Sequence, residues 1–104
     1  MPVPDELHVL DALHEVIDPE LGLSIVDLGL IYAVEISPDG DVRIQYTVTA
    51  PGCPMSSVIG SGIVQTIGRL PGVREVEADL VYSPPWNPEL MSERAMESLW
   101  QSQH

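Results

Sequence analysis

Apolar residues recur along the chain with two spacings, every third or fourth position in some segments and every second position in others. The first kind of spacing predicts a helix over residues 5–17. Its apolar stripe is expected to consist of Leu7, Leu10, Leu13 and Ile17, widened by Val9 and Val16. Asp18 and Pro19 should end this helix, because a residue before proline avoids the α region, and residues 20–27 should follow as a loop.

Strict alternation predicts two neighbouring strands over residues 30–37 and 42–49, separated by turn residues at 38–41. Their apolar faces are expected to be Leu30, Tyr32, Val34 and Ile36 on the first strand and Val42, Ile44, Tyr46 and Val48 on the second. These strands should form an antiparallel hairpin with one buried face. A third strand is expected over residues 75–82, with an apolar face made of Val76, Ala78, Leu80 and Tyr82.

A second helix is expected over residues 55–70, with an apolar stripe made of Met55, Val58, Ile59, Ile63, Ile67 and Leu70. Its glycines, Gly60, Gly62 and Gly68, weaken the helix but permit close packing on the sheet. Three prolines exclude regular structure from residues 83–88, and Ser92 suits the N-cap of a short last helix that carries Ala95, Met96, Leu99 and Trp100. The order α-β-β-α-β-α predicts an α+β two-layer sandwich, in which helices cover one face of a small mixed three-stranded sheet.

Length and charge narrow the classes of function. The 104 residues suit a single domain, 1–104, with a core over about residues 5–100. With 16 acidic and 4 basic residues the formal net charge is −12, which would repel nucleic acids and anionic membranes. The chain shows no apolar run of the roughly 18 residues that span a bilayer and no pattern typical of a signal peptide. A cytoplasmic location is the default expectation.

Cys53 is the single cysteine, so the chain cannot form an internal disulfide or an autonomous four-thiolate metal site. Pro54 suits a first helical position, which makes Cys53 a candidate N-cap of the second helix. Helix N–H groups and the helix dipole would then favour the thiolate, the form that binds iron and attacks electrophiles. The alternative is a buried structural cysteine, and the Pro51–Pro54 turn, which lies off the apolar stripe, argues against it.

Acidic residues flank the loop between the first helix and the first strand. Asp18, Glu20 and Asp27 would supply oxygen ligands or a proton acceptor if this loop folded over the cysteine turn, whereas turn formation alone also explains Asp18 and Asp27. Thr49 is either a hydrogen-bond donor to the sulfur or a solvated strand residue.

Histidines and Trp86 have simpler interpretations. His8 and His14 are six residues apart, so they lack the spacing of a helical metal pair and are expected at the surface. Trp86 is expected to be a hydrophobic plug rather than a stacking platform.

Five ordered blocks carry a resemblance to a known family. They are residues 18–22 (DPELG), 25–32 (IVDLGLIY), 47–55 (TVTAPGCPM), 71–73 (PGV) and 82–86 (YSPPW). This pattern resembles the SufT/PaaD-like family of metal–sulfur cluster assembly factors, within the iron–sulfur cluster assembly domain-like superfamily. The resemblance implies a role in maturing iron–sulfur proteins, with Cys53 as the reactive thiol or metal ligand. It further implies homodimerisation and a pocket around Cys53 that comprises Asp18, Glu20, Asp27, Thr49, Gly52 and Pro54.

The leading hypothesis is a non-enzymatic factor that assembles or transfers a transient iron–sulfur cluster, of the [2Fe–2S] type, or iron alone. Because each chain offers one thiol, a bridging [2Fe–2S] cluster would need two copies and further thiols. The expected partners are iron–sulfur assembly proteins, client apoproteins and a separate P-loop ATPase carrier.

Three other functions are kept beside it. One is an adaptor that binds no cluster, and another is a PaaD-like maturation factor for an oxygenase, although PaaD-type proteins carry further cysteines in a C-terminal extension and these 104 residues contain only Cys53. A thiol enzyme ranks low, since no histidine forms a recognised constellation with Cys53.

Overall fold

A computed structural model describes residues 3–19, 21–49 and 55–97 of the chain. The elements are α1 (Glu6–Leu13), β1 (Ile17–Asp18), β2 (Leu23–Ser24), β3 (Ile31–Ile36), β4 (Asp41–Tyr46), α2 (Met55–Gly68), β5 (Glu75–Leu80) and the 3₁₀ turn η1 (Pro88–Leu90). A further helical turn covers residues 93–97. No described helix is long and apolar enough to cross a membrane.

The main sheet is mixed, as the sequence predicts. Its strand order is β3-β4-β5, with β3 antiparallel to β4 and β4 parallel to β5. The predicted hairpin is confirmed, and Gly40, with φ 95°, occupies its turn in the left-handed region that glycine tolerates best. The parallel pair is joined through α2, as parallel strands require a crossover connection.

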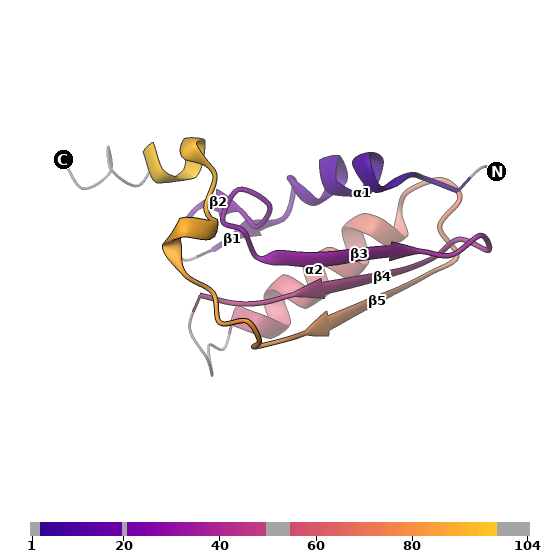
Figure 1. Ribbon diagram of the computed structural model, residues 1–104. Coiled ribbons are helices and arrows are strands. Elements are labelled where there is room, and N and C mark those ends of the chain that lie inside the picture. Colours follow the sequence, from indigo (N-terminus) through magenta and orange to yellow (C-terminus); the bar gives the residue numbers. More distant parts are fainter. Residues whose placement is uncertain (1–2, 20, 50–54, 98–104) are drawn as a thin grey trace.

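The core lies between the sheet and the two longer helices, α1 and α2 (Figure 1). The central strand β4 and the residue two positions after it contribute the predicted face, Val42, Ile44, Tyr46 and Val48, which is buried along its whole length. Helix α2 adds Ile59, Ile63 and Ile67 at a spacing of four, and α1 adds Val9 and Leu13. The expected two-layer α+β arrangement, with helices on one face of the sheet, is therefore confirmed.

The phase and length of the first helix differ from the prediction. Helix α1 begins after its N-cap Asp5 and ends at Leu13, well before Ile17. Its buried face runs through Val9, Leu13 and, beyond the helix, Val16, so Leu7 is 76% exposed rather than part of the stripe. Ile17 belongs to β1, since the chain leaves the helix early to pair with β2.

Several apolar positions lie at the surface rather than in the core. Val58 is 51% exposed on the outer side of α2, and Tyr82 is 50% exposed because β5 ends two residues before it. Met96 is also largely exposed, whereas Ala95 of the same helical turn is fully buried. The expected contributions of Leu99 and Trp100 lie outside the described residues.

Two further expectations need correction. The predicted loop over residues 20–27 contains β2, which pairs antiparallel with β1 as a separate two-stranded sheet. Alternation with the apolar face of residues 42–48 places Thr47 on the opposite, solvated face. Thr47 is nevertheless almost fully buried, because β4 ends at Tyr46 and the Thr47 N–H donates to the Leu30 carbonyl at 2.8 Å.

The helix glycines behave as predicted at two of three positions. A Cβ at Gly60 would lie 2.5 Å from the Tyr46 hydroxyl, and one at Gly62 would lie 3.2 Å from Val16, so both permit close packing. Gly68 has open space around it, so close packing does not explain this glycine.

Candidate functional site

One end of the sheet, where β4 and β5 finish, collects segments that are far apart in the sequence (Figure 1). We call it the hairpin end, after the β1–β2 hairpin, and define it as residues 14–19, 21–29, 47–49 and 86–97. It contains the β1–β2 hairpin, the turn that follows β2, and the helical turn at residues 93–97. The described candidates Asp18, Asp27 and Thr49 lie in these segments.

Asp18 lies in the β1–β2 hairpin and is 4% exposed. Its carboxylate Oδ1 accepts a hydrogen bond from the Leu21 N–H at 3.3 Å, and its carbonyl accepts from the Gly22 N–H at 2.7 Å. Gly22 adopts φ 68°, which closes the turn. Asp18 thus stabilises the hairpin through its own turn, the role that Asp commonly plays before proline.

Asp27 connects the turn after β2 to the C-terminal segment. Its Oδ1 accepts a hydrogen bond from the Ser92 hydroxyl at 3.2 Å, and its carbonyl accepts from the Ser92 N–H at 2.7 Å. Ser92 Oγ in turn accepts from the Ala95 N–H at 3.1 Å, which confirms Ser92 as the predicted N-cap. The Asp27 side chain is held in place but remains 20% exposed.

The two residues after Asp27 complete the contact with the C-terminal segment. Trp86 Nε1 donates to the Leu28 carbonyl at 2.6 Å while its ring packs against the core, so the predicted plug also has a polar anchor. Gly29 adopts φ 75°, and a Cβ there would overlap the Leu90 carbonyl oxygen. Close packing of residues 86–92 on this turn therefore explains why Asp27, Leu28 and Gly29 occur together.

The end of β4 is tied to the start of α2. The Tyr46 hydroxyl donates to the Ser56 carbonyl, in the first turn of α2, at 3.0 Å. Burial raises the pKa of Tyr46, and the nearby charges of Tyr82 and Asp79 raise it further. Thr49 follows buried Val48 and is half-buried. Cys53, Glu20, Gly52 and Pro54 lie outside the described residues, so their place in the predicted pocket stays a prediction.

His14 belongs to this region, although the spacing of histidines in the sequence gave no sign of it. The residue caps the C-terminus of α1, and its Nε2 lies 3.8 Å from Asp27 Oδ1. Its side chain is 44% exposed, in keeping with the expected surface position. His8 also meets a carboxylate, Asp5, but only within its own helix turn and with both side chains mostly in solvent. The hydrogen bond from the His8 N–H is the main reason that the pKa of Asp5 is lowered.

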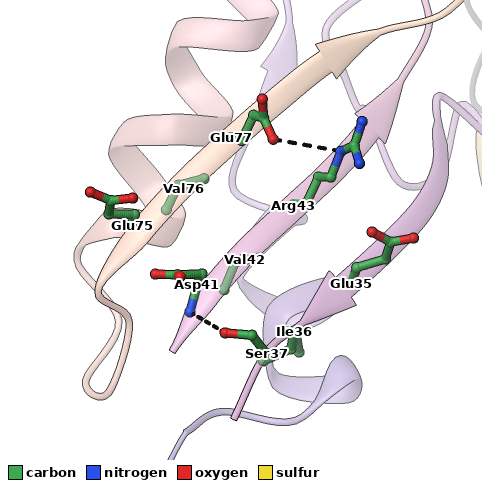
Figure 2. A pocket seen from close by; sticks show the side chains of 9 residues that line it. All are labelled: Glu35, Ile36, Ser37, Asp41, Val42, Arg43, Glu75, Val76 and Glu77. Atoms are coloured by element: carbon green, nitrogen blue, oxygen red, sulfur yellow. Dashed lines mark hydrogen bonds and ion pairs between the residues drawn. The ribbon is translucent and has the colours of Figure 1, made fainter. Parts of the chain in front are cut away.

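Away from the hairpin end, a concave region lies on the face of the sheet that the helices leave uncovered (Figure 2). It has a volume of about 600 Å³. We call its charged residues the open face; they are Glu35, Asp41, Arg43, Glu75 and Glu77, with Asp79 beside them. Arg43 makes ion pairs with Asp79 at 2.6 Å and with Glu77 at 3.6 Å. Of the predicted site residues that the structure describes, none lines this open face.

Within the described part of the chain, no three His, Cys, Asp or Glu side chains gather into a metal site. A cluster or metal held by this chain would thus need ligands beyond the described residues or from outside the chain, as the single cysteine also requires.

Comparison with known proteins decides the family. Residues 6–80 match the family described as "Iron-sulfur cluster assembly protein". The chain belongs to this family.

Individual relatives agree with this family. The chain is 40% identical over 88 residues to the Fe-S protein maturation auxiliary factor YitW of Bacillus subtilis, which covers 85% of this chain and 86% of YitW. It is also 40% identical over 80 residues to the Fe-S protein maturation auxiliary factor SufT of Staphylococcus aureus, covering 77% of this chain and 91% of SufT. The resemblance to SufT-like factors is therefore confirmed.

A solved structure shows the same fold. A DUF59 domain from Bacillus anthracis superposes with a TM-score of 0.88 at 40% identity and covers 91% of each chain. The α+β architecture of this family member is thus shared with a solved relative over nearly its whole length.

Proposed function

We propose that this protein is a non-enzymatic factor that assembles or transfers iron–sulfur clusters, and that Cys53 is its iron ligand or reactive thiol. Membership of the iron-sulfur cluster assembly protein family and the similarity to two Fe-S protein maturation auxiliary factors support the role in cluster assembly. The observation that supports a site at the hairpin end is that the segments carrying Asp18, Asp27 and Thr49 all lie at the end of the sheet where β4 and β5 finish (Figure 1).

Chain connectivity supports Cys53 as the reactive residue. Cys53 stands four residues after Thr49 and two residues before α2 in the chain, and both described neighbours belong to the end where β4 finishes. Carboxylates nearby would raise the pKa of a thiol, whereas the N-terminus of a helix would lower it, so the balance decides how much thiolate is available.

Asp18 and Asp27 already have hydrogen-bonded structural roles. In the proposal, Asp18 shapes the hairpin and Asp27 keeps a partly exposed oxygen available as a ligand. Glu20, Thr49, Gly52 and Pro54 complete the proposed pocket.

The proposed cargo is iron or a transient [2Fe–2S] cluster. A [2Fe–2S] cluster takes four ligands and each chain has one thiol, so two copies of this chain would bridge it together with small thiols or thiols of a client. Such a cluster would be exposed and readily released, which suits transfer to apoproteins. The proposed partners are cluster assembly proteins, client apoproteins and a separate P-loop ATPase carrier.

Anaerobic reconstitution with ferrous iron, sulfide and glutathione tests the role of Cys53. The wild type should gain visible absorbance and bound iron, and its mass in size-exclusion chromatography should double. Cys53→Ser should lose the absorbance and the bound iron, whereas Asp79→Asn on the open face, a control for a changed acidic residue, should behave as wild type. Equal iron retention by Cys53→Ser would exclude ligation through the thiol.

A transfer assay separates the carrier from an adaptor. Incubation of the reconstituted protein with an apo iron–sulfur enzyme should restore that enzyme's activity, and Cys53→Ser should not. If Cys53→Ser supports client activation as well as the wild type does when a complete assembly system supplies the cluster, the protein acts as an adaptor instead.

A further inference from the structure

A cavity of about 370 Å³ opens at the hairpin end, between the end of α1, the β1–β2 hairpin and the helical turn at residues 93–97. Its polar wall comes from four side chains, His14, Ser24, Asp27 and Arg94. Residues 14–27 and the distant helical turn at residues 93–97 thus place an imidazole, a hydroxyl, a carboxylate and a guanidinium around one space. The predicted chemistry around Cys53 does not account for His14 or Arg94.

The orientation of His14 is set by a backbone contact. Its Nδ1 lies 3.1 Å from the Leu10 carbonyl oxygen. A carbonyl only accepts hydrogen bonds, so Nδ1 carries the proton and a neutral ring keeps a lone pair on Nε2. A backbone carbonyl on one ring nitrogen is the usual support for a histidine that binds a metal through the other nitrogen.

The carboxylate opposite His14 is also held in place. Asp27 receives the Ser92 hydroxyl on Oδ1 at 3.2 Å, and this same oxygen faces His14 Nε2 at 3.8 Å. That separation is too long for a hydrogen bond between the two groups. One ion can lie between the two atoms, because zinc, a first-row ion, binds histidine nitrogen at about 2.0–2.1 Å and carboxylate oxygen at about 2.0–2.2 Å, and these two bond lengths together exceed the separation.

We propose that His14 and Asp27 form a two-ligand docking site for a divalent first-row transition ion, which is ferrous iron if the protein handles iron–sulfur clusters. The choice of iron rests on the proposed function, whereas the site itself rests on the geometry of the pair. The cavity leaves room for the remaining ligands of the ion, which would be water or small thiols. An ion held by two protein ligands exchanges readily, as a loading site requires.

The second His–Asp pair in the chain provides a built-in contrast. His8 Nδ1 lies 2.8 Å from Asp5 Oδ1, so the two groups are already bonded to each other, and Asp5 also accepts the His8 N–H. Their side chains are 75% and 65% exposed. His8 Nδ1 and Asp5 Oδ1 are hydrogen-bonded to each other, so these two atoms are not available to a metal ion. We therefore expect this pair to bind a metal poorly.

Arg94 gives the site a distinguishing property. A guanidinium in the cavity wall repels a bare cation but attracts an anion, such as a thiolate that comes with the metal. Replacing Arg94 by Gln should therefore tighten binding of the aquated ion severalfold and weaken binding of an ion that carries a thiolate.

Cobalt(II) titration of the full chain tests the proposal, with Cys53→Ser as the parent so that the thiol does not contribute. Cobalt, a paramagnetic substitute for ferrous iron, should broaden the NMR signals of the His14 ring and the Ala95 amide first. By calorimetry, His14→Ala and Asp27→Asn should each weaken binding about tenfold or more. His8→Ala, the matched control, should bind as tightly as the parent.

The same titrations distinguish binding at His14 and Asp27 from binding elsewhere on the protein. Broadening centred on His8 or spread over the acidic surface, or unchanged affinity of His14→Ala, would overturn the proposal. Since Asp27→Asn also changes the acceptor of the Ser92 hydroxyl from a carboxylate to an amide oxygen, the NMR map of the parent protein provides evidence that does not depend on that variant's fold. Loss of cluster reconstitution in the protein that retains Cys53 concerns the proposed function, whereas the cobalt result in the Cys53→Ser parent concerns only His14 and Asp27.

Discussion

The hairpin end and the open face both carry charged side chains, but the structure uses these charges in different ways. At the hairpin end, Asp27 is bonded to Ser92, 65 residues away in the chain, and both groups are partly buried. On the open face, Arg43 pairs with acidic neighbours across the strands while about half of its side chain stays in solvent. Solvent screens the second kind of pair, so its contribution to stability is small.

The difference shows what distinguishes a built site from a charged surface. At the hairpin end, tertiary contacts position the hydrogen-bond donors and acceptors. One such contact is the hydrogen bond from Trp86 Nε1 to the Leu28 carbonyl. On the open face the sheet register alone places Glu35, Arg43 and Glu77 in one row. The open face has the larger cavity, but the hydrogen bonds that orient side chains at the hairpin end are the better indicator of function.

Gly29→Ala should have the largest effect on the hairpin end. Alanine at φ 75° is strained by about 1–2 kcal/mol, and its Cβ would overlap the Leu90 carbonyl and lie 2.7 Å from Leu90 Cβ. We expect the free energy of unfolding to fall by about 3 kcal/mol or more in urea denaturation.

Gly22→Ala is the matched control, because Gly22 has φ 68° but nothing within 4 Å of the added carbon. It should lose only the conformational part, about 1–2 kcal/mol. Equal losses of stability in Gly29→Ala and Gly22→Ala would mean that residues 86–92 do not pack closely on the turn at Gly29.

Tyr46→Phe should have an intermediate effect and a specific pH dependence. Loss of the hydrogen bond to the Ser56 carbonyl should cost about 1 kcal/mol at neutral pH. Burial raises the Tyr46 pKa above its unfolded value, so the stability that the neutral phenol contributes is complete below about pH 10 and is lost as the pH rises through the folded value. The stability gap between wild type and Tyr46→Phe should therefore narrow above about pH 10.

Thermal unfolding at several alkaline pH values measures this gap. Tyr82→Phe, at a half-exposed tyrosine, should leave most of the alkaline loss in place. A gap that stays constant with pH would show that Tyr46 ionises as easily in the folded protein as in the unfolded chain.

The periodic elements of the fold could be predicted because their causes are local. Alternation over residues 42–48 shows which face of β4 is buried, and the spacing of Ile59, Ile63 and Ile67 shows which side of α2 meets it. The β1–β2 hairpin could not be found in this way, since two-residue strands carry no period. Within the predicted stripe of α1, Val9 and Leu13 are buried but Leu7 is exposed, because only tertiary packing decides which of these apolar residues face the core.

Prediction of the candidate site was limited by long-range contacts. Asp18 and Asp27 were singled out through their motifs, but the Ser92 partner of Asp27 has no signal in a single sequence. His14 lies at the surface as expected, but its approach to Asp27, 13 positions away, arises only after the chain folds back. Contacts of this kind depend on the path of the chain between them rather than on the residues alone.

Arg43→Gln should have the smallest effect on stability. A large effect would contradict the distinction drawn between the open face and the hairpin end. The guanidinium is bonded to Asp79 and close to Glu77, and these charges raise its pKa, with Asp79 as the main cause. Because the group is exposed, the change in midpoint temperature should be smaller than for any substitution above and should shrink further in about 1 M salt, where charges are screened within about 3 Å. Arg43→Lys, which keeps the charge, should match the wild type. A loss as large as that of Gly29→Ala, and insensitive to salt, would mean that the open face is as firmly built as the hairpin end and equally qualified to be a site.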